Sequence, residues 1–237
     1  MKNFLEKNRL LLPLVSFLFI GCSVNNGISL IYLFDTSGSF HRTALPNSVE
    51  LAEKLFYEIS SEQDGIPIFP QIHQVGTIDE QSVNIGFNCN IRIDQKNIFE
   101  KDQSNPDLLD CLNKIKTSKR SQYTDLDGAL LTASQSMQTT GLYGRGIVLF
   151  SDLHEDVPKP KSFNYDLSGI SIFVVYEVSK QQIREPGLFE KDRNALIQKL
   201  TDHGVNKNDI IFRNLKSLNT SPNEIVSFFR KSFKNNQ

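Results

Sequence analysis

The chain has 237 residues, with 26 lysines and arginines against 27 aspartates and glutamates, so its formal net charge at pH 7 is −1. This length suits one domain with a sizeable core. The balanced charge lacks the basic excess of a nucleic-acid-binding protein, so we expect no nucleic-acid partner.

The start of the chain has the pattern of a secretion signal. Lys2, Lys7 and Arg9 form a basic beginning, and residues 10–20 form an apolar stretch. That stretch has the length of a signal-peptide core and is too short to span a bilayer comfortably. It leads into the sequence FIGCS, in which a small residue precedes Cys22. This sequence resembles a bacterial lipoprotein box.

The lipoprotein resemblance implies that residues 1–21 are a signal peptide, which is cleaved off so that Cys22 can be acylated. Residues 22–27 are then a lipid anchor with a short tether, and residues 28–237 form the exported domain. We expect a membrane-anchored lipoprotein of the cell envelope, facing the periplasm or the cell surface. Ser23 is not the aspartate associated with inner-membrane retention, which favours the outer membrane. A buried structural Cys22 and an uncleaved membrane anchor remain the alternatives.

From residue 28 onward, apolar strand patterns alternate with helical ones. The expected strands, in chain order, are residues 28–34, 66–75, 82–93, 147–152, 170–176 and 209–212. The expected helices are residues 46–60, 107–115, 126–137 and 186–203, and a last one that begins near residue 221. Such alternation predicts an α/β fold with a doubly wound, mostly parallel sheet flanked by helices. A short turn around Asp79 predicts that the second and third strands pair antiparallel at one edge.

Two cysteines remain beyond the signal sequence. Cys89 lies on the apolar face of the expected strand 82–93, and Cys111 shares a helix face with Leu108 and Leu112. An oxidising envelope permits a disulfide between Cys89 and Cys111. The alternative is two buried free thiols, which pack well as small hydrophobes.

The most informative motif follows the first expected strand. Residues 35–39 read DTSGS and come directly after the apolar strand 28–34. In an open α/β sheet, ligands bind at the carboxyl ends of the strands. Asp35, Ser37 and Ser39 offer hard oxygen donors, which suit Mg²⁺, Ca²⁺ or Mn²⁺ and do not suit zinc or copper.

Two later positions complete the pattern. Thr124 lies in the loop just before the expected helix 126–137, and Asp152 closes a second apolar strand. The sequence D-x-S-x-S, a threonine before a helix and an aspartate closing a strand together resemble the metal-ion-dependent adhesion site of von Willebrand factor type A (vWA) domains. The resemblance covers roughly residues 28–233 and implies a vWA-like, Rossmann-like sheet with one antiparallel edge strand. Many members of the family carry glycine after the last aspartate, where this chain has Leu153.

The resemblance implies a divalent cation, Mg²⁺ or else Mn²⁺ or Ca²⁺, and a set of five residues that hold it: Asp35, Ser37, Ser39, Thr124 and Asp152. Two carboxylates roughly balance the charge of one dication. In the family, an acidic side chain of a protein partner completes the metal's shell, which is favourable where the interface excludes solvent. We therefore expect metal-dependent protein binding, in adhesion or envelope assembly, with no catalysis and no small-molecule cofactor.

Two other functions stay open. The same fold can serve without metal as a structural envelope module. Alternatively, an aspartate after the first strand can accept a phosphoryl group, although the haloacid-dehalogenase-like phosphatases carry a second carboxylate where this chain has Ser37. The sequence contains neither G-x-S-x-G nor H-E-x-x-H. His41 and His154 are expected near the metal face as exposed loop residues.

Overall fold

The computed structural model describes residues 25–60, 70–79, 89–94, 106–158, 162–218 and 221–235. The expected signal peptide and Cys22 lie outside these residues, as do residues 82–88 of the third expected strand. Within the described part of the chain, no helix combines the length and the apolar character that a membrane crossing requires.

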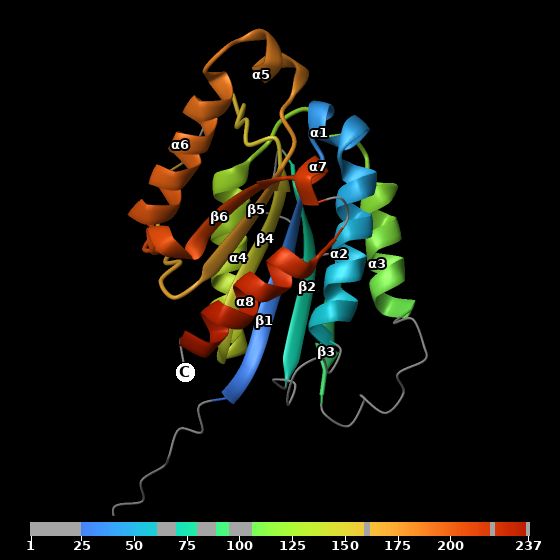
Figure 1. Ribbon diagram of the computed structural model, residues 1–237, viewed down its shortest axis with the longest axis vertical. Coiled ribbons are helices and arrows are strands. Elements are labelled where there is room, and N and C mark those ends of the chain that lie inside the picture. Colours follow the sequence, from blue (N-terminus) through green and yellow to red (C-terminus); the bar gives the residue numbers. More distant parts are fainter. Residues whose placement is uncertain are drawn as a thin grey trace, which may run out of the picture.

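The described residues form one six-stranded sheet covered by helices on both sides (Figure 1). Its strands are β1 (Asn25–Asp35), β2 (Gln71–Ile78), β3 (Cys89–Ile93), β4 (Leu142–Ser151), β5 (Ser171–Tyr176) and β6 (Ile210–Asn214). Their order in the sheet is β3-β2-β1-β4-β5-β6. The β2–β3 pair at one edge is antiparallel and the other pairs are parallel. The predicted α/β class, the mostly parallel sheet and its antiparallel edge strand are confirmed.

Each face of the sheet has its own helices and its own hydrophobic core. On one face lie α2 (Leu45–Ser60), α3 (Pro106–Lys116) and α8 (Asn223–Asn235). On the other face lie α4 (Leu126–Thr140) and α6 (Leu188–Asp202). The sheet is therefore doubly wound, as the alternation of strands and helices predicts.

The central strand β1 is apolar on both faces because both faces are covered. Leu30, Tyr32 and Phe34 point into the core under α2, α3 and α8. Ile31 and Leu33 point into the core under α4 and α6. The strand begins at Asn25, three residues before its predicted start, so part of the expected tether belongs to the sheet.

The sequence pattern did not predict three short helices. They are α1 (Gly38–Thr43), α5 (Lys180–Arg184) and α7 (Leu215–Leu218), and all three lie at the end of the sheet where β1 finishes (Figure 1). With four to six residues each, they are too short to show a helical repeat of apolar residues.

The predicted helix 186–203 begins later than expected. Gly187 has a backbone φ of 91°, which a continuing right-handed helix does not allow. Pro186 therefore lies in the turn between α5 and α6, and α6 begins at Leu188.

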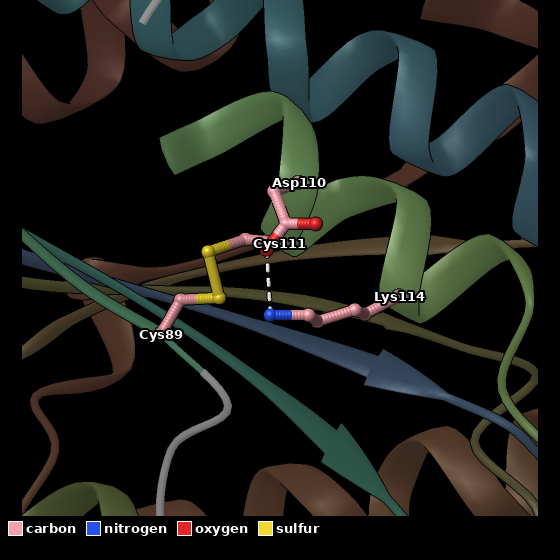
Figure 2. Close-up of a disulfide and its surroundings, with 4 residues drawn as sticks. All are labelled: Cys89, Asp110, Cys111 and Lys114. Carbon is pink, nitrogen blue, oxygen red and sulfur yellow. Dashed lines mark ion pairs between the residues drawn. A yellow bond between two sulfur atoms is a disulfide. The ribbon is translucent and has the colours of Figure 1, made fainter. Parts of the chain in front are cut away.

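A disulfide between Cys89 and Cys111 joins the edge strand β3 to α3 (Figure 2). The two Cα atoms are 5.9 Å apart, and the cysteines are separated by 22 positions in the sequence. On the exposed side of α3, Asp110 and Lys114 form an ion pair of 2.6 Å one turn apart. The covalent link holds a five-residue strand at the sheet edge, where pairing comes from one side alone.

A polar network is buried between β1, β2 and α2. The Tyr32 hydroxyl donates to Nδ1 of His73 over 3.0 Å, and Nε2 of His73 lies 3.0 Å from the side-chain oxygen of Gln71. This arrangement satisfies a neutral imidazole with its proton on Nε2. Because His73 is fully buried, its pKa falls to about 3.

The buried histidine makes stability depend on pH in acid. The ordinary histidine pKa is 6.5, so between pH 6.5 and pH 3 the unfolded chain binds a proton that the folded chain does not, and stability falls as pH falls. From about pH 7 to about pH 4.5, this group alone is expected to lower the free energy of unfolding by roughly 2.5 kcal/mol. Urea unfolding of the wild type and of His73→Gln at both pH values measures this difference. Equal losses in the two proteins would contradict it.

Candidate metal centre

The register between β1 and β4 brings two polar residues together at the carboxyl edge of the sheet. Phe34 pairs with Phe150, and their rings stack with centroids 4.7 Å apart. The next residues on the two strands are Asp35 and Ser151. The Ser151 hydroxyl donates to Oδ2 of Asp35 over 2.7 Å.

The Asp35 carboxylate is fully buried and surrounded by uncharged donors. Its Oδ1 accepts a hydrogen bond from the backbone N–H of Ser37 at 2.8 Å and lies 3.5 Å from the hydroxyl of Thr124. Three of the five expected ligands, Asp35, Ser37 and Thr124, therefore meet around one carboxylate.

The loop that carries Thr124 is fixed by backbone contacts with the DTSGS segment. Ser37 and Ser121 form an isolated parallel bridge, and the N–H of Ser121 donates to the carbonyl of Thr36 over 2.8 Å. The N–H of Thr124 donates to the side chain of Asp156 over 2.8 Å. These bonds place Thr124 beside Asp35, although the two are 89 positions apart in the sequence.

Asp152 lies at the end of β4 and is 2% exposed. The Ser39 hydroxyl donates to its Oδ2, and the N–H of His154 donates to its Oδ1 over 3.2 Å. From α5, the side-chain amide of Gln182 donates to the Asp152 carbonyl over 2.8 Å. The structure thus brings Asp152 to Ser39 on the same edge of the sheet as Asp35.

Leu153, which follows Asp152, has an unusual backbone conformation. Its φ is 69°, the single positive φ of a non-glycine residue in the described ranges. Glycine adopts this left-handed conformation without strain, whereas a leucine does so at a cost. Here the leucine side chain is buried in the core under α4 and α6, and that packing offsets the strain.

The two carboxylates lie close enough to influence each other. Burial and the negative charge of Asp152 raise the pKa of Asp35 to about 7. Burial also raises the pKa of Asp152, although hydrogen bonds from Ser39 and from the His154 amide act in the opposite direction. The site therefore concentrates negative charge where little water reaches it.

A cavity of about 520 Å³ opens above these residues. Its lining includes Ser37, Ser39, Thr124 and Asp152 of the expected ligand set. His154 lines the cavity as well, and its Nδ1 lies 3.1 Å from a carboxylate oxygen of Asp192. His41 instead lies with Nε2 3.0 Å from the carbonyl of Ser118.

The donor set fits a hard divalent cation. Two carboxylates and three hydroxyls supply oxygen donors, the type that Mg²⁺ prefers, and the carboxylates lie in a buried setting with uncharged hydrogen-bond partners. A cluster of three or more His, Cys, Asp or Glu side chains placed to share a metal does not occur among the described residues. A metal shell among these residues would therefore combine the carboxylates with neutral oxygens, from hydroxyls, backbone carbonyls or water.

Sequence reasoning missed two residues of the site. Ser151 is not part of the D-x-S-x-S pattern. Its place at the end of a strand, directly before Asp152, was the one sign in the sequence that it belongs to the site. Asp156 lies in a loop with no periodic pattern, and its contact with the Thr124 amide depends on the fold.

No family model and no curated protein matches the chain. Among solved structures, the von Willebrand factor domain of the type V pilus tip protein Mfa5 from Porphyromonas gingivalis aligns with a TM-score of 0.51 at 12% identity. The alignment covers 89% of this chain and 97% of that domain. The chain therefore has the fold of a vWA domain.

Two longer proteins also align. One is the von Willebrand factor type A protein from Catenulispora acidiphila, with a TM-score of 0.49, 14% identity and 88% of this chain covered. The other is the pilus adhesin SpaC from Lactobacillus rhamnosus GG, with a TM-score of 0.49, 10% identity and 89% covered. The alignments span 43% and 30% of those two chains, so this chain corresponds to less than half of either.

Proposed function

We propose that this chain is a metal-dependent protein-binding module. The metal is Mg²⁺, or Mn²⁺ or Ca²⁺ in its place, and its ligands are Asp35, Ser37, Ser39, Thr124 and Asp152. The observation that carries this proposal is a pair of buried carboxylates, Asp35 and Asp152, whose repulsion a dication would offset; Asp152 lines the cavity and Asp35 lies below it. When bound, the cation supplies a Lewis-acidic position that favours a carboxylate of a partner over water.

The residues of the chain prepare this site in two ways. Ser151 and the Ser37 amide orient the Asp35 carboxylate, and the His154 amide orients Asp152. The exposed Ser39 hydroxyl lines the cavity, so the ligand set reaches solvent on that side. A partner can therefore approach the metal position from the cavity without opening the sheet.

The sequence of the strand-end loop argues against Asp35 as a phosphoryl acceptor. The haloacid-dehalogenase-like phosphatases carry a second carboxylate two residues after the nucleophile, where this chain has Ser37. We therefore propose a binding function without catalysis.

Isothermal titration calorimetry with Mg²⁺, Mn²⁺ and Ca²⁺ tests the metal proposal. We expect saturable binding of one ion per chain by at least one of these metals. A parallel phosphatase assay with a chromogenic phosphate ester is expected to show no turnover. If none of the three ions binds, a metal-free structural envelope module becomes the better hypothesis. Metal-dependent hydrolysis of the ester would instead favour a phosphatase.

We also propose that the chain is anchored to a bacterial envelope membrane by acylation of Cys22. β1 begins at Asn25, three positions after Cys22, and Asp35 lies at its other end. A strand of 11 residues extends about 33 Å. The lipid and the metal position would then lie at opposite ends of one strand, with the cavity directed away from the membrane.

Mass spectrometry of the membrane-extracted protein checks the anchor. The expected mass corresponds to loss of residues 1–21 and addition of acyl chains at Cys22. Cys22→Ser is expected to lack the acyl mass and to leave the membrane fraction. A mature protein that still begins at Met1 would contradict the proposal.

A further inference from the structure

The cavity at the candidate metal centre has a cationic rim. Arg42 follows the DTSGS segment in α1, Arg120 precedes the Thr124 loop, and Lys180 begins α5. All three side chains belong to exposed residues that line the cavity, and in the described part of the chain they form no ion pair. We infer that this rim selects a polypeptide segment with several acidic residues, of which one reaches the metal position and the others reach the rim. The inference rests on the proposed function of the same site.

Arg120 lies close to the DTSGS segment (residues 35–39). A Cβ atom built on Gly38 would lie 2.0 Å from Nη2 of Arg120, so the guanidinium occupies the space that a side chain at position 38 would need. The guanidinium therefore lies against Gly38, which stands between the candidate ligands Ser37 and Ser39 in the sequence. A guanidinium in this position can bind a second carboxylate in a bidentate manner.

The cavity lining also contains three acidic residues. Asp156 accepts a hydrogen bond from the Thr124 amide, and Glu177 pairs with Lys216 over 3.1 Å. Asp152 belongs to the proposed metal shell. Apart from that ion pair and Asp152, the lining carries the positive side chains of Arg42, Arg120 and Lys180 against the single carboxylate of Asp156, so the rim has a net positive charge.

An apolar side chain lies on the same rim. Ile183 of α5 is 70% exposed and lines the cavity. A capping box between Ser179 and Gln182 fixes α5, and Gln182 also donates to the Asp152 carbonyl and to Asp192. The helix therefore presents Ile183 at a defined place relative to Asp152.

This combination fits a polypeptide better than a uniformly anionic polymer. A sulfated polysaccharide offers charge alone and no aliphatic side chain for Ile183. A polypeptide can place carboxylates at the rim and a leucine or valine over Ile183. The occupant is therefore an acidic segment with an adjacent apolar residue.

Selection from a displayed library of random peptides tests the inference, with the full chain immobilised in detergent in the presence of Mg²⁺. We expect the enriched peptides to carry several acidic residues and an aliphatic one. A selected peptide is expected to bind the variant Arg42→Gln/Arg120→Gln/Lys180→Gln about tenfold more weakly, because each exposed charge pair contributes a fraction of a kcal/mol. High salt is expected to weaken binding to the wild type more than binding to this variant.

The matched control is Lys191→Gln/Lys207→Gln/Lys231→Gln, which removes the same charge from exposed residues outside the cavity lining. Affinity unchanged in this control, together with the loss in the rim variant, supports the inference. Ile183→Ser is expected to remove the preference for the aliphatic residue.

Three outcomes would overturn the inference. In one outcome, the enriched peptides need Mg²⁺ and Asp35 but carry one acidic residue among neutral ones. In that case the metal proposal is retained, and the cationic rim does not select acidic peptides. If heparin binds equally with Mg²⁺ and with chelator and only the rim variant loses it, the rim is a polyanion site. If nothing is enriched over an Asp35→Ala control, the proposed function fails together with the inference.

Discussion

Replacement of Asp35 by asparagine is expected to abolish the stabilisation of this fold by Mg²⁺. At free Mg²⁺ about 1,000 times the dissociation constant, the wild type is expected to gain about 4 kcal/mol in its free energy of unfolding. Asp35→Asn keeps the size of the side chain and an oxygen for the Ser37 amide but removes the charge that the dication requires. Chemical unfolding of both proteins, in Mg²⁺ and in chelator, measures the two gains.

The chelator arm separates loss of metal from loss of folding. In chelator, Asp35→Asn is expected to be at least as stable as the wild type, because it removes a buried charge next to Asp152. The matched control is Asp127→Asn, which changes a carboxylate bound by Tyr165 at the start of α4. That variant is expected to keep the Mg²⁺-dependent gain. If Asp35→Asn is still stabilised by Mg²⁺, Asp35 is not a ligand of the metal.

Loss of the disulfide is expected to lower stability by about 3 kcal/mol, the loop-closure entropy for a separation of 22 residues. The variant Cys89→Ser/Cys111→Ser removes the link between β3 and α3 without leaving a free thiol. Urea unfolding of this variant and of the oxidised wild type measures the loss. The metal-dependent gain is expected to persist, because neither cysteine lines the cavity.

Asp110→Asn is the control for this region. It removes the exposed ion pair with Lys114 beside the disulfide (Figure 2) and is expected to change stability by less than about 1 kcal/mol. Equal stability of the oxidised wild type and the double serine variant would mean that packing alone holds β3 in place.

The sequence predicted the parts of the fold that have strong periodicity. The strand that ends at Asp35 is apolar from Leu30 to Phe34 because it is buried on both faces, and this run can be recognised in the sequence without a structure. For the two cysteines, the sequence left open either a disulfide or two free thiols, because it gives no distance between them. The predicted start of α6 at Pro186 was wrong. Proline is common in the first helical turn, but Gly187 has a left-handed backbone conformation, so the helix begins after it.

That the residues of the candidate site gather at one edge of the sheet was predictable from the sequence, and their surroundings were not. Asp35, Thr124 and Asp152 follow strands or precede a helix, so the sheet topology alone gathers them at one edge. Arg42, Arg120 and Lys180 belong to loops and short helices, and their common position depends on how those segments pack. The contact of Arg120 with Gly38 has no counterpart in any sequence pattern.

The place of β1 in the sheet has a mechanical consequence. If the proposed anchor at Cys22 and the proposed partner at the metal position are both correct, a pull between membrane and partner runs along this strand. From Ile28 onward, β1 pairs with β2 on one side and with β4 on the other, both parallel to it. A force along the strand loads these two rows of bonds in shear, so that they must yield together rather than open one after another. The module would therefore carry tension through its most strongly held element, while the helices and the disulfide-linked edge stay outside the line of force.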